Sequence, residues 1–230
     1  MGKKKYVFFF LTVLILLFFL FEILSNESMD KKDGYLIKGE KYSVEIIKNK
    51  SSQYANKIYI NSIGKKKSTF TKDISDLNVW KLEVGDIDGD GIDEVGLGVY
   101  TQSPLHPIDA KRPYIYTFNG EKLIAKWRGS RLSRPFVDFI FYDIDKDTSD
   151  EILSIEVLKD GKYIINSYKW KGFGFEGYLE SETLDNKPKF IIEDSNLYIE
   201  KSDLEFYKLE VNKEVEKLEW RLRWNLKKYV

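Results

Sequence analysis

The chain contains 230 residues, with 37 Lys and Arg, 37 Asp and Glu, one His and no Cys. Because the formal net charge is zero, we do not expect a basic surface that binds nucleic acid. The lack of Cys excludes disulfides, a thiol nucleophile and Cys-ligated metals, and a single His excludes a multi-histidine metal site.

An apolar segment opens the chain. Residues 6–24 contain one charge, Glu22, and a bilayer crossing takes about 20 such residues. Three Lys precede the segment, so the positive-inside rule places residues 1–5 as a cytoplasmic tip. The sequence therefore predicts a single-pass membrane protein with an uncleaved anchor at 6–24 and its C-terminal domain outside the cytoplasm. The alternative is a signal peptide whose cleavage leaves a secreted domain.

The polar stretch 25–34 is expected to be a solvated linker, followed by one domain at 35–230. That domain consists of short alternating segments separated by turn residues, which is typical of an all-β protein. The predicted strands are residues 42–47, 57–63, 79–84, 95–100, 114–118, 136–142, 152–158, 163–170, 190–192 and 197–200. The C-terminal segment fits both a helix and a strand, and the strict alternation around Trp220 and Trp224 favours a final strand.

An acidic loop follows the predicted strand at 79–84. In residues 86–94, Asp occupies alternate positions and two Gly allow a tight turn. Calcium prefers several oxygen ligands at short range, which this pattern supplies. The predicted ligands are Asp86, Asp88, Asp90, the Ile92 carbonyl and Glu94. An EF-hand is disfavoured because position 12 is Leu97, and the alternative reading is an acidic turn that holds no metal.

Arginine is concentrated in one part of the chain. Four of the six Arg lie between positions 112 and 134, beside the only His and four of the five Pro. Since Arg forms bidentate hydrogen bonds with anions, we hypothesise a pocket or groove for an anionic cell-surface polymer or a partner protein's acidic tail. Its predicted residues are His106, Arg112, Trp127, Arg131 and Arg134. The alternative is that these Arg pair with acidic turns of neighbouring repeats.

A second acidic loop repeats the first at an offset of 57 residues. It keeps the acids but replaces both Gly with Lys146 and Thr148. The corresponding second calcium set is Asp143, Asp145, Asp147, Ser149 and Glu151. The alternative is a turn in which the Asp side chains bond only their own backbone.

Two landmarks repeat in the same order. The acidic loop recurs after 57 residues, and the segment 116–120 recurs at 168–172, after 52 residues. A unit of this length holds about four short strands, the size of one propeller blade. The predicted fold class is all-β, with about four β-propeller-like blades of four antiparallel strands, preceded by one transmembrane helix.

The acidic loop and the apolar strand that follows it, residues 86–95, resemble the FG-GAP or VCBS repeat, the integrin-alpha type of propeller blade. The resemblance covers about residues 57–180. It implies calcium coordination by the ligands named above, with calcium as a structural ion that rigidifies the turn.

No sequence motif indicates catalysis. The chain has no Gly-x-Ser-x-Gly elbow, phosphate-binding loop or zinc motif, and we predict no catalytic residues. We expect a membrane-anchored, calcium-binding recognition or adhesion module at the cell surface. The alternatives are a structural accessory subunit of a membrane complex and a polysaccharide-directed hydrolase that uses paired carboxylates.

Overall fold

The computed structural model describes residues 12–17, 26–64, 69–129, 131–202 and 205–225. These residues form four antiparallel sheets, each of four strands that follow one another in the chain. The first sheet contains β1 (Asn26–Ile37), β2 (Glu40–Asn49), β3 (Lys57–Ser62) and β4 (Thr69–Asp73), and the second β5 (Val79–Gly85), β6 (Glu94–Ser103), β7 (His106–Phe118) and β8 (Leu123–Arg128). The third contains β9 (Phe136–Tyr142), β10 (Glu151–Val157), β11 (Tyr163–Trp170) and β12 (Phe175–Glu180), and the fourth β13 (Lys189–Glu193), β14 (Asn196–Ser202), β15 (Glu205–Asn212) and β16 (Lys217–Asn225). A short 3-10 helix, Ser75–Leu77, precedes β5.

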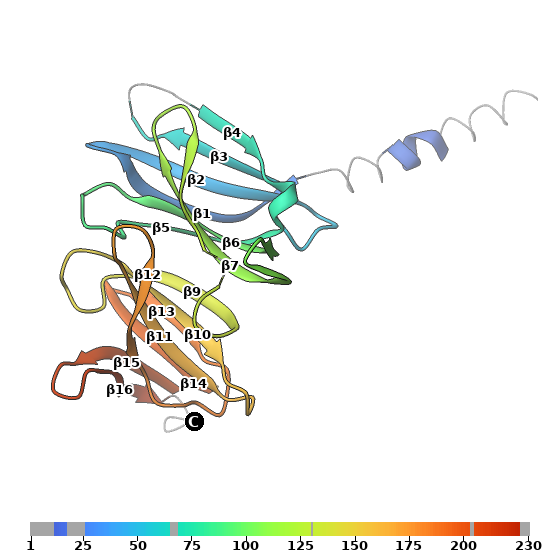
Figure 1. The fold of residues 1–230 in the computed structure, drawn as a ribbon. Coiled ribbons are helices and arrows are strands. Elements are labelled where there is room, and N and C mark those ends of the chain that lie inside the picture. The colour runs from blue at the N-terminus through green and yellow to red at the C-terminus, as the bar shows by residue number, and fades with distance from the viewer. Residues whose placement is uncertain (1–11, 18–25, 65–68, 130, 203–204, 226–230) are drawn as a thin grey trace, which may run out of the picture.

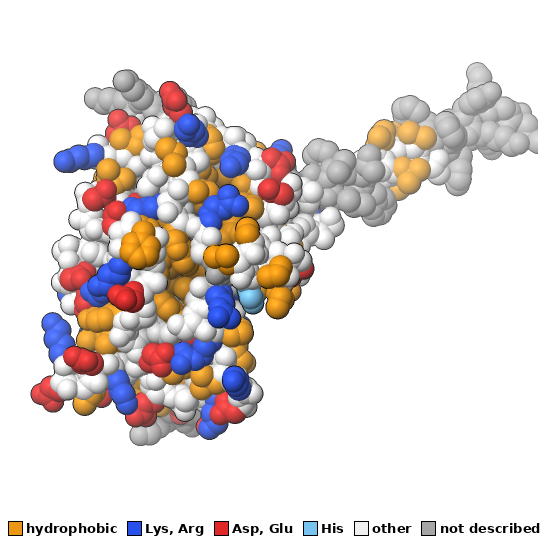
Figure 2. Space-filling view, viewed as in Figure 1, with side chains coloured by type: hydrophobic (Ala, Val, Ile, Leu, Met, Phe, Trp, Pro, Cys, Tyr) orange, Lys and Arg blue, Asp and Glu red, His pale blue; other side chains and the backbone are white. Residues whose placement is uncertain are grey.

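The sheets follow one another from β1–β4 at one end of the molecule to β13–β16 at the other (Figure 1). Three hydrophobic clusters join them, each between consecutive sheets. Within the described residues, no such cluster joins the fourth sheet to the first. In the same view, hydrophobic side chains also gather on the surface in the middle of the molecule (Figure 2). The predicted all-β, four-bladed propeller arrangement is confirmed.

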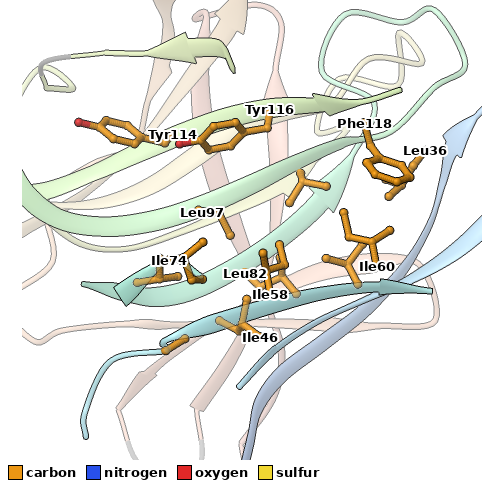
Figure 3. Packing of buried hydrophobic residues seen from close by; sticks show 14 of the residues in the cluster. Leu36, Ile46, Ile58, Ile60, Ile74, Leu82, Leu97, Tyr114, Tyr116 and Phe118 are labelled. Atoms are coloured by element: carbon orange, nitrogen blue, oxygen red, sulfur yellow. The ribbon is translucent and has the colours of Figure 1, made fainter. Parts of the chain in front are cut away.

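The cluster between the first two sheets shows why the alternating pattern forms this fold (Figure 3). Ile58 and Ile60 of β3 are fully buried and separated by one residue, as expected when alternate side chains of a strand point to one face. Leu82 and Leu97 meet them from the second sheet. Each fully buried side chain of this size contributes about 1.5–3 kcal/mol to folding.

The boundary between the second and third sheets is built from aromatic residues. A Cβ atom on Gly96 of β6 would lie 2.4 Å from a ring atom of Phe141 on β9, so only Gly allows this close approach. The ring of Phe139 packs edge-on to Trp80, with centroids 5.9 Å apart. The second and third blades therefore pack closely against each other at this boundary.

The repeat predicted from the acidic loops is the blade itself. Val79 and Phe136, the first residues of β5 and β9, are 57 positions apart, whereas β8 and β12 begin 52 positions apart. The two offsets differ by five residues because β7 has 13 residues, whereas β11 has 8. The second blade therefore has a longer hairpin between β6 and β7 than the third blade has between β10 and β11.

The stretch predicted as a linker, residues 25–34, forms most of β1 from Asn26 onward. Its polar side chains bond to the second sheet: Lys32 Nζ lies 2.7 Å from the buried Glu83 carboxylate, and Asp30 accepts a hydrogen bond from the Leu82 N–H. This polar segment, whose composition is typical of solvated linkers, thus forms part of the interface between the first two blades. The predicted final strand is confirmed as β16.

The prediction of a transmembrane helix at residues 6–24, and of a single-pass membrane protein, is corrected. Within the described residues, no helix is long and apolar enough to cross a membrane. The helical residues described there are 12–17, which rise only about 9 Å against a hydrocarbon core of about 30 Å. An uncharged run alone does not establish a spanning helix. Residues 6–11 and 18–24, and the predicted cytoplasmic tip at 1–5, lie outside the described residues.

Candidate metal centres

The two acidic loops occupy the same place in two consecutive blades. One joins β5 to β6 and the other joins β9 to β10. Gly89 and Gly91 have φ angles of 74° and 80°, in the left-handed region. Lys146 and Thr148 adopt the same region at the equivalent positions, with φ angles of 65° and 79°. The loss of both Gly has therefore not changed the path of the second turn.

The first Asp of each loop organises the turn. The Asp86 carboxylate accepts hydrogen bonds from the backbone N–H groups of Gly89 (2.8 Å), Asp90 (3.2 Å) and Gly91 (2.8 Å). In the second loop, the Asp143 carboxylate accepts in the same way from the backbone N–H groups of Asp147 (3.0 Å) and Thr148 (3.1 Å). Such bonds from an Asp side chain to its own backbone stabilise a turn without any ion.

Each loop brings together acids that could hold a metal ion. Carboxylate oxygens of Asp86, Asp88 and Asp90 lie within 4.8 Å of one another. In the second loop the corresponding group is Asp143, Asp145 and Glu151. Both sets offer only oxygen donors, the ligands that hard divalent cations prefer.

Two other predicted acidic ligands, Glu94 and Asp147, are not members of these groups. Asp147 of the second loop accepts the Ser149 N–H at 3.0 Å. Ile92 donates its N–H to Asp90 Oδ1 at 2.8 Å.

The last acid of each loop is buried beneath the turn. Glu94 is 1% exposed, and its Oε2 accepts the Ile87 N–H at 3.2 Å. Glu151 is also 1% exposed, and its Oε2 accepts the Ile144 N–H at 3.0 Å. Burial raises the pKa of each carboxyl to about 7, against the lowering effect of a nearby Lys.

A lysine ammonium lies against each loop. Lys126 of β8 donates to Asp88 and, at 2.7 Å, to Glu94. A divalent ion held by the first loop must therefore displace Lys126 from Asp88 or share that carboxylate with it. The all-oxygen group fits a metal, and Lys126 is the cation that competes with it.

The second loop is neutralised more fully. Lys169 of β11 contacts three of its acids, at 2.7 Å from Asp145 and 3.2 Å from Glu151, with Asp147 as the third. The hydroxyl of Tyr178 also donates to Asp145, at 2.9 Å. Burial lowers the pKa of Lys169, but its three carboxylate partners hold that pKa well above the ordinary value.

The eighth residue of each loop links its blade to the preceding one. Asp93 accepts the Tyr35 N–H of β1 at 2.6 Å, and its own N–H donates to the Tyr35 carbonyl at 2.9 Å. Its equivalent, Asp150, donates its N–H to the Asp86 carbonyl at 2.6 Å. Burial, with Asp93 and Asp143 nearby, raises the pKa of Asp150 to about 6. Sequence reasoning missed this role, although the 57-residue repeat marks the pair.

The predicted anion-binding residues are only partly brought together. His106, Arg131 and Arg134 line one pocket between the long hairpin and the segment that leads into β9. Arg112 is fully buried behind His106. Trp127 lies elsewhere, packed edge-on against Phe175 with ring centroids 5.1 Å apart.

Arg134 is engaged by acids, although these lie within strands and not in the acidic turns that the alternative named. Its Nη1 lies 3.1 Å from the buried Glu156 and 2.7 Å from Glu180 of β12, so it pairs with acids of the third blade.

Compared with known proteins, the chain matches no protein-family model and no curated protein sequence.

Proposed function

We propose that this chain is a non-catalytic recognition module, a propeller of the FG-GAP or VCBS type that binds structural calcium at its first acidic loop. The observation that carries the proposal is the convergence of Asp86, Asp88 and Asp90 within 4.8 Å at the turn between β5 and β6. The repeated loop at the same turn of the third blade supports the family assignment.

Calcium is the ion that suits this donor set. The carboxylates supply hard oxygen ligands, and the turn contributes neither sulfur nor imidazole nitrogen, which softer metals prefer. When bound, the ion supplies positive charge that offsets the repulsion among the three Asp. The Asp86 carboxylate already accepts three backbone N–H groups, which form the turn without the ion. The role of the ion is therefore to rigidify this turn.

The recognition role rests on the long hairpin between β6 and β7. Binding residues are often carried by loops that a rigid scaffold positions. Here the hairpin rises from a blade that is packed on both faces. Leu105 and Ile108 near its tip are 89% and 61% exposed, although both are apolar.

The test of calcium binding is thermal unfolding of the full chain in excess calcium and in chelator. A calcium concentration 100 times the dissociation constant stabilises a protein by about 2.7 kcal/mol. For a chain of this size that corresponds to a rise in melting temperature of about 5–10 °C. An unchanged melting temperature would overturn the calcium proposal.

Two matched variants locate the site. Asp90→Asn and Asp147→Asn change the same position of the two loops, and only Asp90 belongs to a group of clustered acids. We expect Asp90→Asn to remove most of the calcium-induced rise and Asp147→Asn to leave it. Loss in Asp147→Asn alone would instead place the ion at the second loop, and equal loss in both variants would distribute it over both loops.

A further inference from the structure

The pocket beside the long hairpin has walls suited to an apolar ligand. Its volume is about 430 Å³, and it lies between the hairpin and residues 131–136. Ile108 and Ala110 of β7 form one side, and Pro135 and Phe136 form the other. Figure 2 shows hydrophobic side chains gathered in the middle of this face, with basic side chains around them.

A buried guanidinium stiffens the hairpin wall. Arg112 is 0% exposed and donates to the backbone carbonyls of Thr101 (2.8 Å), His106 (3.0 Å) and Ile108 (2.8 Å). Its Nη1 has no hydrogen-bond partner, and no acid among the described residues lies within ion-pair distance of it. The wall is therefore preorganised and carries a buried positive charge that has no ion-pair partner among the described residues.

The same guanidinium favours one tautomer of His106. Arg112 Nη2 lies 3.1 Å from His106 Nδ1, and because Arg can only donate, this contact favours the tautomer in which Nδ1 carries no proton. The ring proton is then on Nε2. His106 lines the pocket, so the Nε2–H is a donor available to a ligand.

The remaining charges of the lining leave an excess of positive charge. Arg134 is paired with two glutamates, whereas exposed Arg131 forms no ion pair within the described part of the chain. Lys111 donates to the Val137 carbonyl at 2.6 Å, and Asp109 is the one acid of the lining. Arg131 thus has a free guanidinium at a pocket whose other charges are largely engaged.

We propose that this pocket binds a small organic acid in which one carboxylate is attached to an apolar body. The carboxylate pairs with Arg131 and accepts the His106 Nε2–H, while the body packs against Ile108, Pro135 and Phe136. One free guanidinium matches one negative charge, and apolar walls disfavour a strongly hydrated dianion such as phosphate. The inference rests on the proposed recognition function and gives it a ligand class.

The test is a calorimetric titration of the full chain with phenylacetate, phenylacetamide and inorganic phosphate. We expect phenylacetate to bind about tenfold more tightly than the neutral amide, the effect of one charge-assisted contact. Equal binding of acid and amide would overturn the carboxylate contact. Tighter binding of phosphate would overturn the ligand class, and no phenylacetate binding would overturn the site.

Matched variants separate this inference from the calcium proposal. Arg131→Gln removes the exposed guanidinium and should weaken phenylacetate binding about tenfold. Arg128→Gln, an exposed neighbour outside the lining, should leave it unchanged. Asp90→Asn should alter the calcium response only. Unchanged affinity in Arg131→Gln would contradict the ligand site, while a missing calcium response would contradict only the metal site.

Discussion

The two acidic loops share one backbone path but balance their negative charge differently. In the first, Lys126 reaches from β8 and contacts Asp88 and Glu94. In the second, Lys169 reaches from β11 and contacts three acids. The position equivalent to Lys126, 52 residues later in β12, is Tyr178. The second loop therefore has a more complete internal counter-ion.

Both loops form the same turn although their counter-ions differ, so this turn does not need a metal to form. Backbone N–H groups satisfy the first Asp in both loops, and an ammonium neutralises the acids beneath. What varies is how many carboxylate oxygens stay available. A motif of alternating acids thus specifies the turn, and the neighbouring strands decide whether a cation from solution can compete.

Removing the counter-ion of the second loop should destabilise the protein most. Lys169→Met leaves Glu151, 1% exposed, beside two further acids with no ammonium. Breaking a buried ion pair in this way destabilises a protein by about 3 kcal/mol. Urea unfolding of the full chain in chelator measures the loss.

The matched control is Lys171→Met, which changes an exposed lysine just after the same strand. Its stability should stay within about 0.5 kcal/mol of the parent. If Lys169→Met were equally mild, the ammonium would not be the element that holds the second loop together.

Removing the counter-ion of the first loop should have a smaller and calcium-dependent effect. Lys126→Met breaks two contacts instead of three, and we expect a loss of about 2 kcal/mol in chelator. Excess calcium should reduce that loss because Asp88 becomes free to bind the ion. Urea unfolding in both conditions checks this, with exposed Lys122→Met as the control. A loss of the same size with and without calcium would show that ion and ammonium do not compete.

Sequence predicted the inner strands of the blades better than the outer ones. β6 and β10 are buried on both faces and read as apolar runs. The spacing of the acidic loops that precede them indicated the blades. β4, β8 and β12 were missed because their side chains are exposed or only partly buried, with the exception of Leu179, and show no hydrophobic alternation. β1 was missed because its charges are satisfied by partners 51 or more residues away in the chain.

Sequence also predicted the acidic turns but not their counter-ions. The alternating Asp and the 57-residue offset are local signals, so both loops could be found. Lys126 and Lys169 are ordinary lysines within strands, and only the pairing of strands brings them to the acids. The Arg-rich segment indicated a pocket, but burial separated Arg112 from the residues that line it.

The acids at the eighth loop position bond to different partners: Asp93 bonds to Tyr35 of β1, and Asp150 to the Asp86 carbonyl. Asp93→Ala removes the acceptor for the Tyr35 N–H, and losing a charge-assisted bond costs about 1.5 kcal/mol. Hydrogen exchange at the Tyr35 amide should then accelerate about tenfold. The amide of Val44, in the middle of β2, should be unchanged, whereas equal acceleration there would indicate general unfolding.

The smallest effect tests whether the two turns are interchangeable in backbone geometry. Thr148→Gly places Gly at a φ of 79°, and Gly91→Thr places Thr at 80°. A left-handed conformation is unfavourable by about 1 kcal/mol for a residue with a side chain, so the first change should stabilise and the second destabilise by that amount. A Cβ atom on Gly91 meets nothing within 4 Å, so steric contact does not confuse the comparison. Urea unfolding in chelator measures both, and the double exchange should restore the parent stability. If both variants lost stability, the side chain of Thr148 would contribute a contact that outweighs its backbone strain, and the second turn would depend on its own sequence more than on a shared path.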